Sequence, residues 1–310
     1  MNRINLPNGL NVSVCALGAM DFGTRVSREE AFRTLDAYVD AGGNFIDTSN
    51  NYAHWAGTGD ESETLLGEWF ALRRCRDKIV LATKVGFDRH GQGAGLKKEQ
   101  IEYWIDESLR KLRTDHIDLY YAHTDDPKTP IGETMEAFQR LIEKGKVRNL
   151  GGSNYDTWRF AEANAIAKAN NLTPYTVMQQ KFTYLNPCGG ARQTFLYNEP
   201  TTRERLRYLA AKNIPLVAYS CLCRGGYENP AKIPEDYTGG KRWEFLRDMA
   251  AEKGVSATAL AIGWMVNLYR CAGNPRVIPL FSASPSHLTE NLRGLELTLT
   301  DEDIKRLDEA

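Results

Sequence analysis

Four side chains that can hold or move a proton follow short apolar runs in the first 125 residues. Asp47 ends the run NFID, Tyr52 follows it, Lys84 ends IVLATK and His123 ends IDLYYAH. A tyrosine phenol titrates near pH 10, but a lysine ammonium beside it would stabilise the phenolate and lower that pKa. A carboxylate would keep the lysine charged, and a histidine could donate a hydrogen bond to a substrate oxygen. This set suits protonation of an alkoxide, or deprotonation of an alcohol, beside a bound hydride donor.

These four residues come together only if the runs are neighbouring parallel strands. Each run is continuously apolar and of strand length, which is typical of parallel strands buried on both faces. The runs are CALGAM (15–20), NFID (44–47), IVLATK (79–84), IDLYYAH (117–123), VRNLGGS (147–153), TVMQQ (176–180), IPLVAYS (214–220) and RVIPL (276–280). Alternation with helical stretches predicts one domain over 1–310, an α/β fold of the (β/α)8 TIM-barrel type. The working groups of such barrels lie at the C-terminal ends of the strands.

Local signals support the helices and an N-terminal hairpin. Apolar residues recur at helical spacing in 97–113 and in 131–147, where Gly145 stands at the expected C-terminal position. Ser27 followed by Glu30 predicts a capping box. Asn8-Gly9 between two short apolar segments predicts a short β-hairpin at the bottom of the barrel. The glycines after the first run do not form the G-x-G-x-x-G turn that a doubly wound nucleotide-binding fold needs.

Composition narrows the function classes. The 310 residues carry 39 Lys+Arg against 40 Asp+Glu, a net charge of −1, so no strongly basic surface favours nucleic acid or an anionic membrane. The start shows no signal-peptide pattern, and no run is long and apolar enough to span a membrane. The scattered cysteines 15, 75, 188, 221, 223 and 271 are expected to be reduced in a cytoplasmic protein, with no metal site. A metal-dependent hydrolase using His123, Asp125 and Asp126 is the weaker alternative, because Lys84 would repel a cation.

Longer stretches resemble the aldo-keto reductase superfamily. The similarity is carried by FIDTSNNYAHWAGTGDESETLLGEW, IVLATKVG, IDLYYAHTDD, VRNLGGSNY and VIPLFSASPSHLTENLRGLELTLTDEDIKRLDEA, in the same order over almost the whole chain. The resemblance implies a catalytic tetrad of Asp47, Tyr52, Lys84 and His123. It also implies a nicotinamide cofactor held by residues after the later strands. Ser153, Asn154 and Gln179 would hold the carboxamide, Tyr219 would stack on the nicotinamide, Ser220 and Leu222 would contact the pyrophosphate, and Glu290 and Asn291 would bind the adenine.

Three departures from the family pattern bear on cofactor and substrate. Where members that use NADP carry a lysine or arginine, this chain has Phe281 and His287, near Ser282 and Ser284. Arg224, Arg276 or a protonated His287 could supply the missing charge, so NADP(H) is favoured and NAD(H) is possible. Cys221 replaces a proline of the pyrophosphate loop. An insertion, AHWAGTGDESE, follows Tyr52, and the residues expected to line the substrate pocket are Trp55, Phe87, Thr124, Phe182 and Tyr227.

The sequence therefore predicts an enzyme that reduces an aldehyde, ketone or sugar carbonyl with NAD(P)H, using Tyr52 as general acid. The alternative is an NAD-dependent dehydrogenase of an alcohol or sugar, which the missing cations would suit. A nucleotide-sensing regulatory subunit is a less favoured third possibility. The expected partner is a small-molecule carbonyl or alcohol, and neither nucleic acid nor a membrane.

Overall fold

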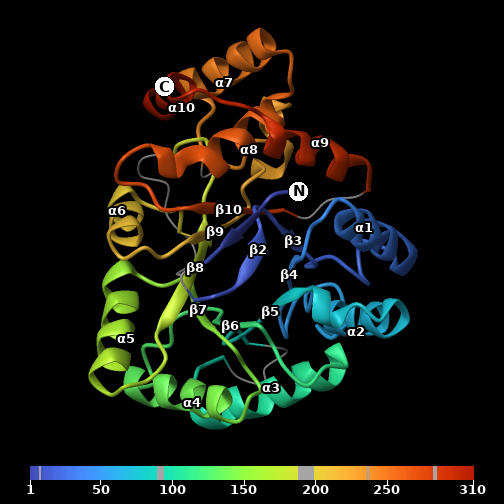
Figure 1. The fold of residues 1–310 in the computed structure, drawn as a ribbon, viewed down its shortest axis with the longest axis vertical. Coiled ribbons are helices and arrows are strands. Elements are labelled where there is room, and N and C mark those ends of the chain that lie inside the picture. Colours follow the sequence, from blue (N-terminus) through green and yellow to red (C-terminus); the bar gives the residue numbers. More distant parts are fainter. Residues whose placement is uncertain (7, 89–93, 188–198, 236, 282–284) are drawn as a thin grey trace. The chain divides into compact units, whose positions relative to one another are not determined.

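Each of the eight apolar runs coincides within one or two residues at each end with a strand of a closed barrel, or contains it, which confirms the predicted fold (Figure 1). The computed structural model describes residues 1–6, 8–88, 94–187, 199–235, 237–281 and 285–310. The strand order is β10-β3-β4-β5-β6-β7-β8-β9. The strands are β3 (Ala16–Gly18), β4 (Phe45–Asp47), β5 (Val80–Val85), β6 (Leu119–Ala122), β7 (Leu150–Ser153), β8 (Tyr175–Lys181), β9 (Leu216–Tyr219) and β10 (Val277–Phe281).

Helices alternate with the barrel strands, as the pattern predicts, and α9 and α10 follow the last strand. They are α1 (Arg28–Asp40), α2 (Glu61–Arg73), α3 (Lys98–Leu112), α4 (Ile131–Glu143), α5 (Thr157–Ala169), α6 (Arg203–Ala211), α7 (Gly240–Lys253), α8 (Ala257–Asn267), α9 (Pro285–Glu296) and α10 (Asp301–Glu309). The Ser27 side chain accepts a hydrogen bond from the amide of Glu30, which is the Ser27 half of the predicted capping box. Gly145 follows the C-cap of α4 with a φ of 70°, a left-handed conformation that glycine adopts without strain.

The predicted hairpin is present and lies at the N-terminal ends of barrel strands. β1 (Arg3–Asn5) pairs antiparallel with β2 (Asn11–Ser13). Asn44, directly before β4, accepts from the Ser13 amide at 2.7 Å and donates to the Asn11 carbonyl at 2.9 Å. These bonds hold the hairpin at the end of the barrel opposite the predicted working groups.

Packing divides the chain within β8 into two compact units. The N-terminal unit comprises Asn2–Met178, and the C-terminal unit comprises Gln179–Ala310 with Met1. A single domain over residues 1–310 stays a prediction. No helix in the described part of the chain is long and apolar enough to cross a membrane. Cys15, Cys75, Cys221 and Cys223 are buried and Cys271 is half-buried, whereas Cys188 lies outside the described residues.

In the N-terminal unit, α2 and α3 approach closely at Gly67. A Cβ atom added at Gly67 would lie 2.0 Å from the backbone oxygen of Lys111, well inside van der Waals contact. Glycine is therefore required for this helix pair to pack. The same pair of helices carries a buried ion pair between Glu63 and Lys111 at 2.8 Å.

We expect Gly67→Ala to lower the free energy of unfolding by roughly 1–3 kcal/mol, because the helices must separate to admit the methyl group. Gly132→Ala is the matched control: it also lies in a helix, and its nearest neighbour is Ile166 Cγ2 at 4.0 Å. The control should be neutral or more stable by up to about 1 kcal/mol. Urea denaturation measures both, and equal stability of the two variants would contradict the packing argument.

Candidate functional site

The centre of the candidate site is the ammonium group of Lys84 in the N-terminal unit. Lys84 is fully buried, and its Nζ donates to Asp47 Oδ1, to the Thr48 carbonyl at 2.6 Å and to Tyr52 Oη at 2.6 Å. An ammonium group has three protons, so these acceptors satisfy all of them. Burial lowers the pKa of Lys84, and the charges of Asp47 and Glu63 oppose that shift.

Strand register explains why Asp47 and Lys84 meet. β4 and β5 are parallel, with Asp47 opposite Ala82. Lys84 lies two residues beyond Ala82 and so shares its face of the strand. Beyond β4 the backbone continues along β5, since the Thr48 amide bonds the Ala82 carbonyl at 2.9 Å. The two charged groups are thus placed by the regular alternation of neighbouring strands.

Tyr52 reaches the same point from the loop that follows β4. Its hydroxyl donates to Asp47 Oδ1 at 3.0 Å and accepts from Lys84, whose Nζ lies 4.4 Å from the centroid of the phenol ring. Ala53, the next residue, has a φ of 60°, a conformation that non-glycine residues seldom adopt. The loop therefore turns sharply just after the phenol, and three of the four predicted catalytic residues lie in direct contact.

His123 follows β6 and completes the group. Its ring centroid lies 5.9 Å from that of Tyr52 and 4.4 Å from that of Phe87, in edge-on arrangements. The backbone is held on both sides: the His123 amide donates to the Val85 carbonyl at 2.7 Å, and the His123 carbonyl accepts from Asn154 Nδ2 at 2.9 Å. Burial, reinforced by the positive charge of Lys84, lowers the pKa of His123 well below the usual 6.5. The imidazole is therefore neutral near pH 7.

A second buried carboxylate behind β5 escaped the sequence analysis. Thr83 alternates with Lys84 along the strand, and its hydroxyl donates to Glu63 Oε1 at 2.7 Å. Glu63 is fully buried and pairs with Lys111. The signal lay in the Ser62-Glu63 pair at the end of the stretch AHWAGTGDESE, where an acidic residue stands on the buried face of a helix.

Of the predicted cofactor residues, Ser153 and Asn154 belong to the N-terminal unit. Ser153 ends β7 and is buried, and Asn154 follows with a φ of 54°. Besides bonding the His123 carbonyl, Asn154 Nδ2 donates to Ser153 Oγ at 3.1 Å. This amide thus ties the predicted carboxamide-binding residues to the backbone of His123.

The other predicted cofactor residues that the structure describes lie in the C-terminal unit. Gln179 is buried in β8, and Tyr219 ends β9, where burial raises its pKa. In the segment after β9, positive φ angles are adopted by Ser220 (55°), Cys223 (50°) and Arg224 (53°). Non-glycine residues rarely take this conformation, and such segments often carry function. Leu222 is half-buried there, and the side chain of Arg224 is exposed.

Cys221, which replaces the family's proline, is buried in this segment. Its Sγ donates to the Leu280 carbonyl at 3.2 Å. Burial raises the pKa of this thiol to about 12, so it stays protonated and packs as a small polar side chain. The thiol therefore anchors the segment to β10 through a bond that a proline could not make.

Helix α9 carries the residues predicted to bind the adenine end. Asn291 is buried, and its Nδ2 has no hydrogen-bond partner among the described residues. Glu290 accepts from Ser256 Oγ at 2.7 Å and pairs with Arg293 at 3.1 Å. His287 is exposed at the start of the helix. Ser282 and Ser284 lie outside the described residues.

Phe281 and Arg276, which bear on the family's missing lysine or arginine, lie at different ends of β10. Phe281 is buried at the C-terminal end of β10. Arg276 precedes the same strand at its other end, and its guanidinium lies 4.2 Å from the centroid of the Tyr269 ring. Five strand residues span roughly 16 Å. Arg276 therefore lies next to the N-terminal end of β10, away from the strand end at which the sequence predicts the cofactor, and Arg224 and His287 are the remaining candidates of the three.

The predicted substrate-pocket residues of the N-terminal unit differ in exposure. Phe87 is half-buried against His123, and Thr124 is buried directly after it. Trp55, in the insertion, is 53% exposed and contacts the His54 ring edge-on at 5.2 Å between centroids. Phe87 and Thr124 thus adjoin the tetrad, and Trp55 lies at the surface.

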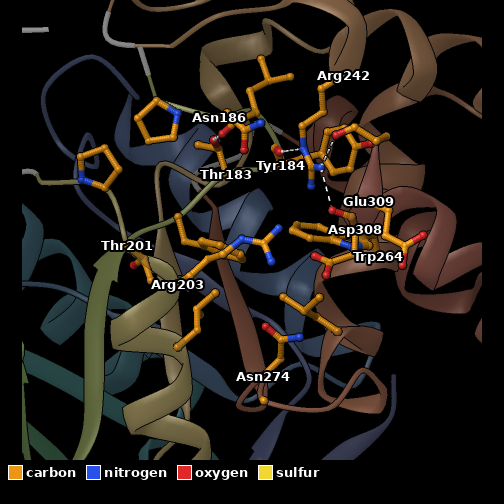
Figure 2. Close-up of a pocket in the computed structure, with 18 of the residues that line it drawn as sticks. Thr183, Tyr184, Asn186, Thr201, Arg203, Arg242, Trp264, Asn274, Asp308 and Glu309 are labelled. Carbon is orange, nitrogen blue, oxygen red and sulfur yellow. Dashed lines mark hydrogen bonds between the residues drawn. The ribbon is translucent and has the colours of Figure 1, made fainter. Parts of the chain in front are cut away.

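The C-terminal unit has a cavity of its own beside Phe182. Phe182 stacks on Trp264 with 5.6 Å between ring centroids, and both line the cavity shown in Figure 2. Arg242 also lines the cavity, and its Nε donates to the Tyr184 carbonyl at 2.6 Å. Tyr227 is fully buried nearby, and its hydroxyl donates to the Cys221 carbonyl at 2.7 Å. The hydroxyl of Tyr227 therefore has a structural bond, and its role in a substrate pocket stays a prediction.

The carboxylates considered as metal ligands have other partners. Asp125 binds the Arg159 guanidinium through two bonds of 2.8 and 3.0 Å. Asp126 accepts from the Leu96 amide and from Thr129 Oγ1. Within the described ranges no group of three His, Cys, Asp or Glu side chains could hold a metal ion. These contacts do not favour the metal-dependent hydrolase.

Comparisons with known proteins show the family and the fold of the chain. The model of the Aldo/keto reductase family matches residues 15–310. The chain is 32% identical to norsolorinic acid reductase A of Aspergillus parasiticus, covering 100% of this chain and 80% of the relative. It is 30% identical to the putative aryl-alcohol dehydrogenase AAD14 of Saccharomyces cerevisiae, and the match covers 97% of this chain and 83% of that relative. The crystal structure of the thermostable aldo-keto reductase Tm1743 with epalrestat shares the fold, with a TM-score of 0.78, 24% identity and coverage of 100% and 99%.

The lowered pKa of His123 predicts its titration behaviour. In an NMR titration its ring resonances should not move between about pH 8 and pH 6, where an ordinary imidazole gains its proton. Lys84→Met should raise this pKa towards the usual value, because the variant removes the neighbouring positive charge. Because the unfolded chain binds the proton first, His123 also makes folding less stable as the pH falls below about 6.5. Loss of one resonance in His123→Gln assigns the signal, and wild-type titration near pH 6.5 would contradict the prediction.

Proposed function

Since the chain belongs to the aldo/keto reductase family and is an oxidoreductase of that family, we propose that it reduces an aldehyde or ketone with NAD(P)H through Tyr52 as general acid. The observation that carries this proposal is the buried Lys84 ammonium bonded to both Tyr52 and Asp47. When the phenol releases its proton, the ammonium group that donates to its oxygen stabilises the phenolate that remains. Such a group can protonate an alkoxide at neutral pH.

In this mechanism each residue of the site has one role in moving the proton or placing the substrate oxygen. The substrate oxygen takes the place of Asp47 as acceptor of the Tyr52 proton. Lys84 stays bonded to the phenol oxygen and stabilises the phenolate after transfer, while Asp47 and the Thr48 carbonyl keep the ammonium in place. A nicotinamide cofactor, when bound, supplies the hydride in reduction and accepts it in oxidation. His123 faces Tyr52 and orients the same substrate oxygen.

The described residues fit a dinucleotide. The buried Asn291 amide, without a partner among them, offers a donor to an adenine ring nitrogen. The segment after β9, in which Ser220, Cys223 and Arg224 have positive φ angles, would present backbone N–H groups to a pyrophosphate, as such conformations do at anion sites. Arg224 and His287 are the candidate partners for a 2′-phosphate. NADP(H) remains our first choice, with NAD(H) as the alternative.

The names of the relatives suggest a substrate class. Norsolorinic acid reductase A and the putative aryl-alcohol dehydrogenase AAD14 act, by their names, on norsolorinic acid and on aryl alcohols. We propose an aromatic ketone, aldehyde or alcohol for this chain, because the half-buried Phe87 ring beside His123 offers a stacking surface. Oxidation of such an alcohol is the second candidate function, since the same Tyr52 phenolate would accept the proton.

Tyr52→Phe tests the general acid. The variant should lose about 100-fold or more in kcat, because a positioned acid contributes at least that much, and should bind cofactor within about twofold of wild type. Steady-state kinetics with an aromatic aldehyde and cofactor titration by tryptophan fluorescence measure the two. Tyr120→Phe is the control: this buried phenol on β6 has no hydrogen-bond partner among the described residues. Near-normal kcat in Tyr52→Phe would overturn the assignment.

Cofactor choice is tested by titrating the protein with NADPH and with NADH. We expect tighter binding of NADPH, and His287→Arg should increase that preference about tenfold by adding a charge-assisted bond to the 2′-phosphate. Asn291→Leu should weaken both cofactors alike, because the adenine is common to them. Preference for NADH in the wild type would favour the dehydrogenase, and binding of neither would exclude the proposed function.

A further inference from the structure

Ser49 connects His123 to a second side chain that the mechanism has not used. Ser49 is fully buried in the loop after β4, and its Oγ lies 3.1 Å from His123 Nδ1. The same hydroxyl donates to Asn51 Oδ1 at 2.8 Å. Asn50 Oδ1 is farther away, at 3.5 Å. Ser49 thus links the imidazole of His123 to the amide of Asn51, and these three residues form what we call the Ser49 relay.

The direction of the hydrogen bond between Ser49 and Asn51 sets the direction of the bond between Ser49 and His123. An amide oxygen only accepts, so the single hydroxyl proton of Ser49 lies on the bond to Asn51. Towards His123, Ser49 can then only accept. The proton must be supplied by His123 Nδ1, which is therefore the protonated ring nitrogen. Because the imidazole is buried and neutral, Nε2 is left without a proton and is a hydrogen-bond acceptor.

This arrangement conflicts with what a reacting carbonyl needs. A carbonyl oxygen, like the alkoxide that follows it, requires a donor, and Nε2 becomes one only when it carries the ring proton. Nδ1 is then bare and must accept from Ser49. The Ser49 hydroxyl has to rotate from Asn51 to His123, while the ring proton passes from Nδ1 to Nε2 by exchange with water. The number of protons is unchanged, and Asn51 Oδ1 loses one hydrogen bond.

We propose that Ser49 and Asn51 are positioning residues that decide which nitrogen of His123 carries the proton, with Asn51 holding the free enzyme in the form that cannot donate to a carbonyl. This inference rests on the proposed function, because it assigns His123 to the substrate oxygen. Substrate binding must displace the Ser49 proton from Asn51. The relay therefore restrains carbonyl reduction by about the value of one neutral hydrogen bond.

Asn51→Leu tests the relay, because leucine has a similar shape and no acceptor. Nitrogen-15 NMR of the cofactor-free protein, with His123 assigned through His123→Gln, should show Nδ1 protonated in the wild type and Nε2 protonated in the variant. The variant should also gain about threefold to tenfold in kcat/KM for a carbonyl substrate, because the displaced hydrogen bond no longer opposes binding. Asn51→Ala removes the same acceptor if the leucine variant does not fold.

Two further variants make the test specific. In a Ser49→Ala background, Asn51→Leu should change neither the spectrum of His123 nor kcat/KM, because the link is already broken. Ser62→Ala removes another fully buried serine hydroxyl, bonded to Thr48 and to the Ala19 carbonyl, and should leave Nδ1 protonated. A wild-type Nε2 proton, or an effect of Asn51→Leu that persists without Ser49, would overturn the proposal. The spectrum decides this without turnover, so failure of the relay is distinguishable from failure of Tyr52 as general acid.

Discussion

A fully buried ammonium group is the constraint around which the N-terminal unit is built. Removing a charge from water costs several kcal/mol unless partners compensate for it. For Lys84 the compensation is complete, because its three protons are donated in hydrogen bonds to a carboxylate, a backbone carbonyl and a phenol oxygen. One of these partners, Tyr52, is the proposed general acid. In the proposed mechanism, the contact with Lys84 that compensates for the buried charge would also prepare the phenol for proton transfer.

The same strand carries a second polar layer on its other face. Thr83 connects β5 to Glu63, and Glu63 pairs with Lys111 between two closely packed helices. Glu63 also opposes the lowering of the Lys84 pKa. The buried carboxylate of Glu63 thus has a hydrogen-bond donor on β5 and an ion-pair partner on α3.

His123 is held at three points that come from different parts of the barrel. Val85 and Asn154 hold its backbone, and Ser49 holds its ring. Asn154 is also a predicted cofactor residue, so a ligand that engages its amide would act on the backbone of His123 as well. The position of the imidazole is consequently fixed by hydrogen bonds to its neighbours, which do not require a positive charge on the ring.

The sequence by itself determined the barrel and the tetrad. Continuous apolar runs mark buried parallel strands, and the C-terminal ends of such strands meet, so Asp47, Lys84 and His123 could be placed together without coordinates. The strand alternation that turns Asp47 and Lys84 to one face follows from the same regularity. A regular sequence pattern is enough to predict where a side chain lies wherever its position along a strand decides its position in space.

Only the tertiary structure decided how the loops close onto those strands. The contact of Ser49 with His123 joins residues 74 apart, and Ser49 lies in the same irregular loop as the left-handed residue Ala53. The positive φ angles after β9 could not be predicted either, because irregular backbone has no sequence period. The close approach of Gly67 to Lys111 joins two regular helices, and the sequence period of each helix does not say where it meets the other. Irregular loops settle into the one path that satisfies their buried polar groups, and those partners lie far away in the sequence.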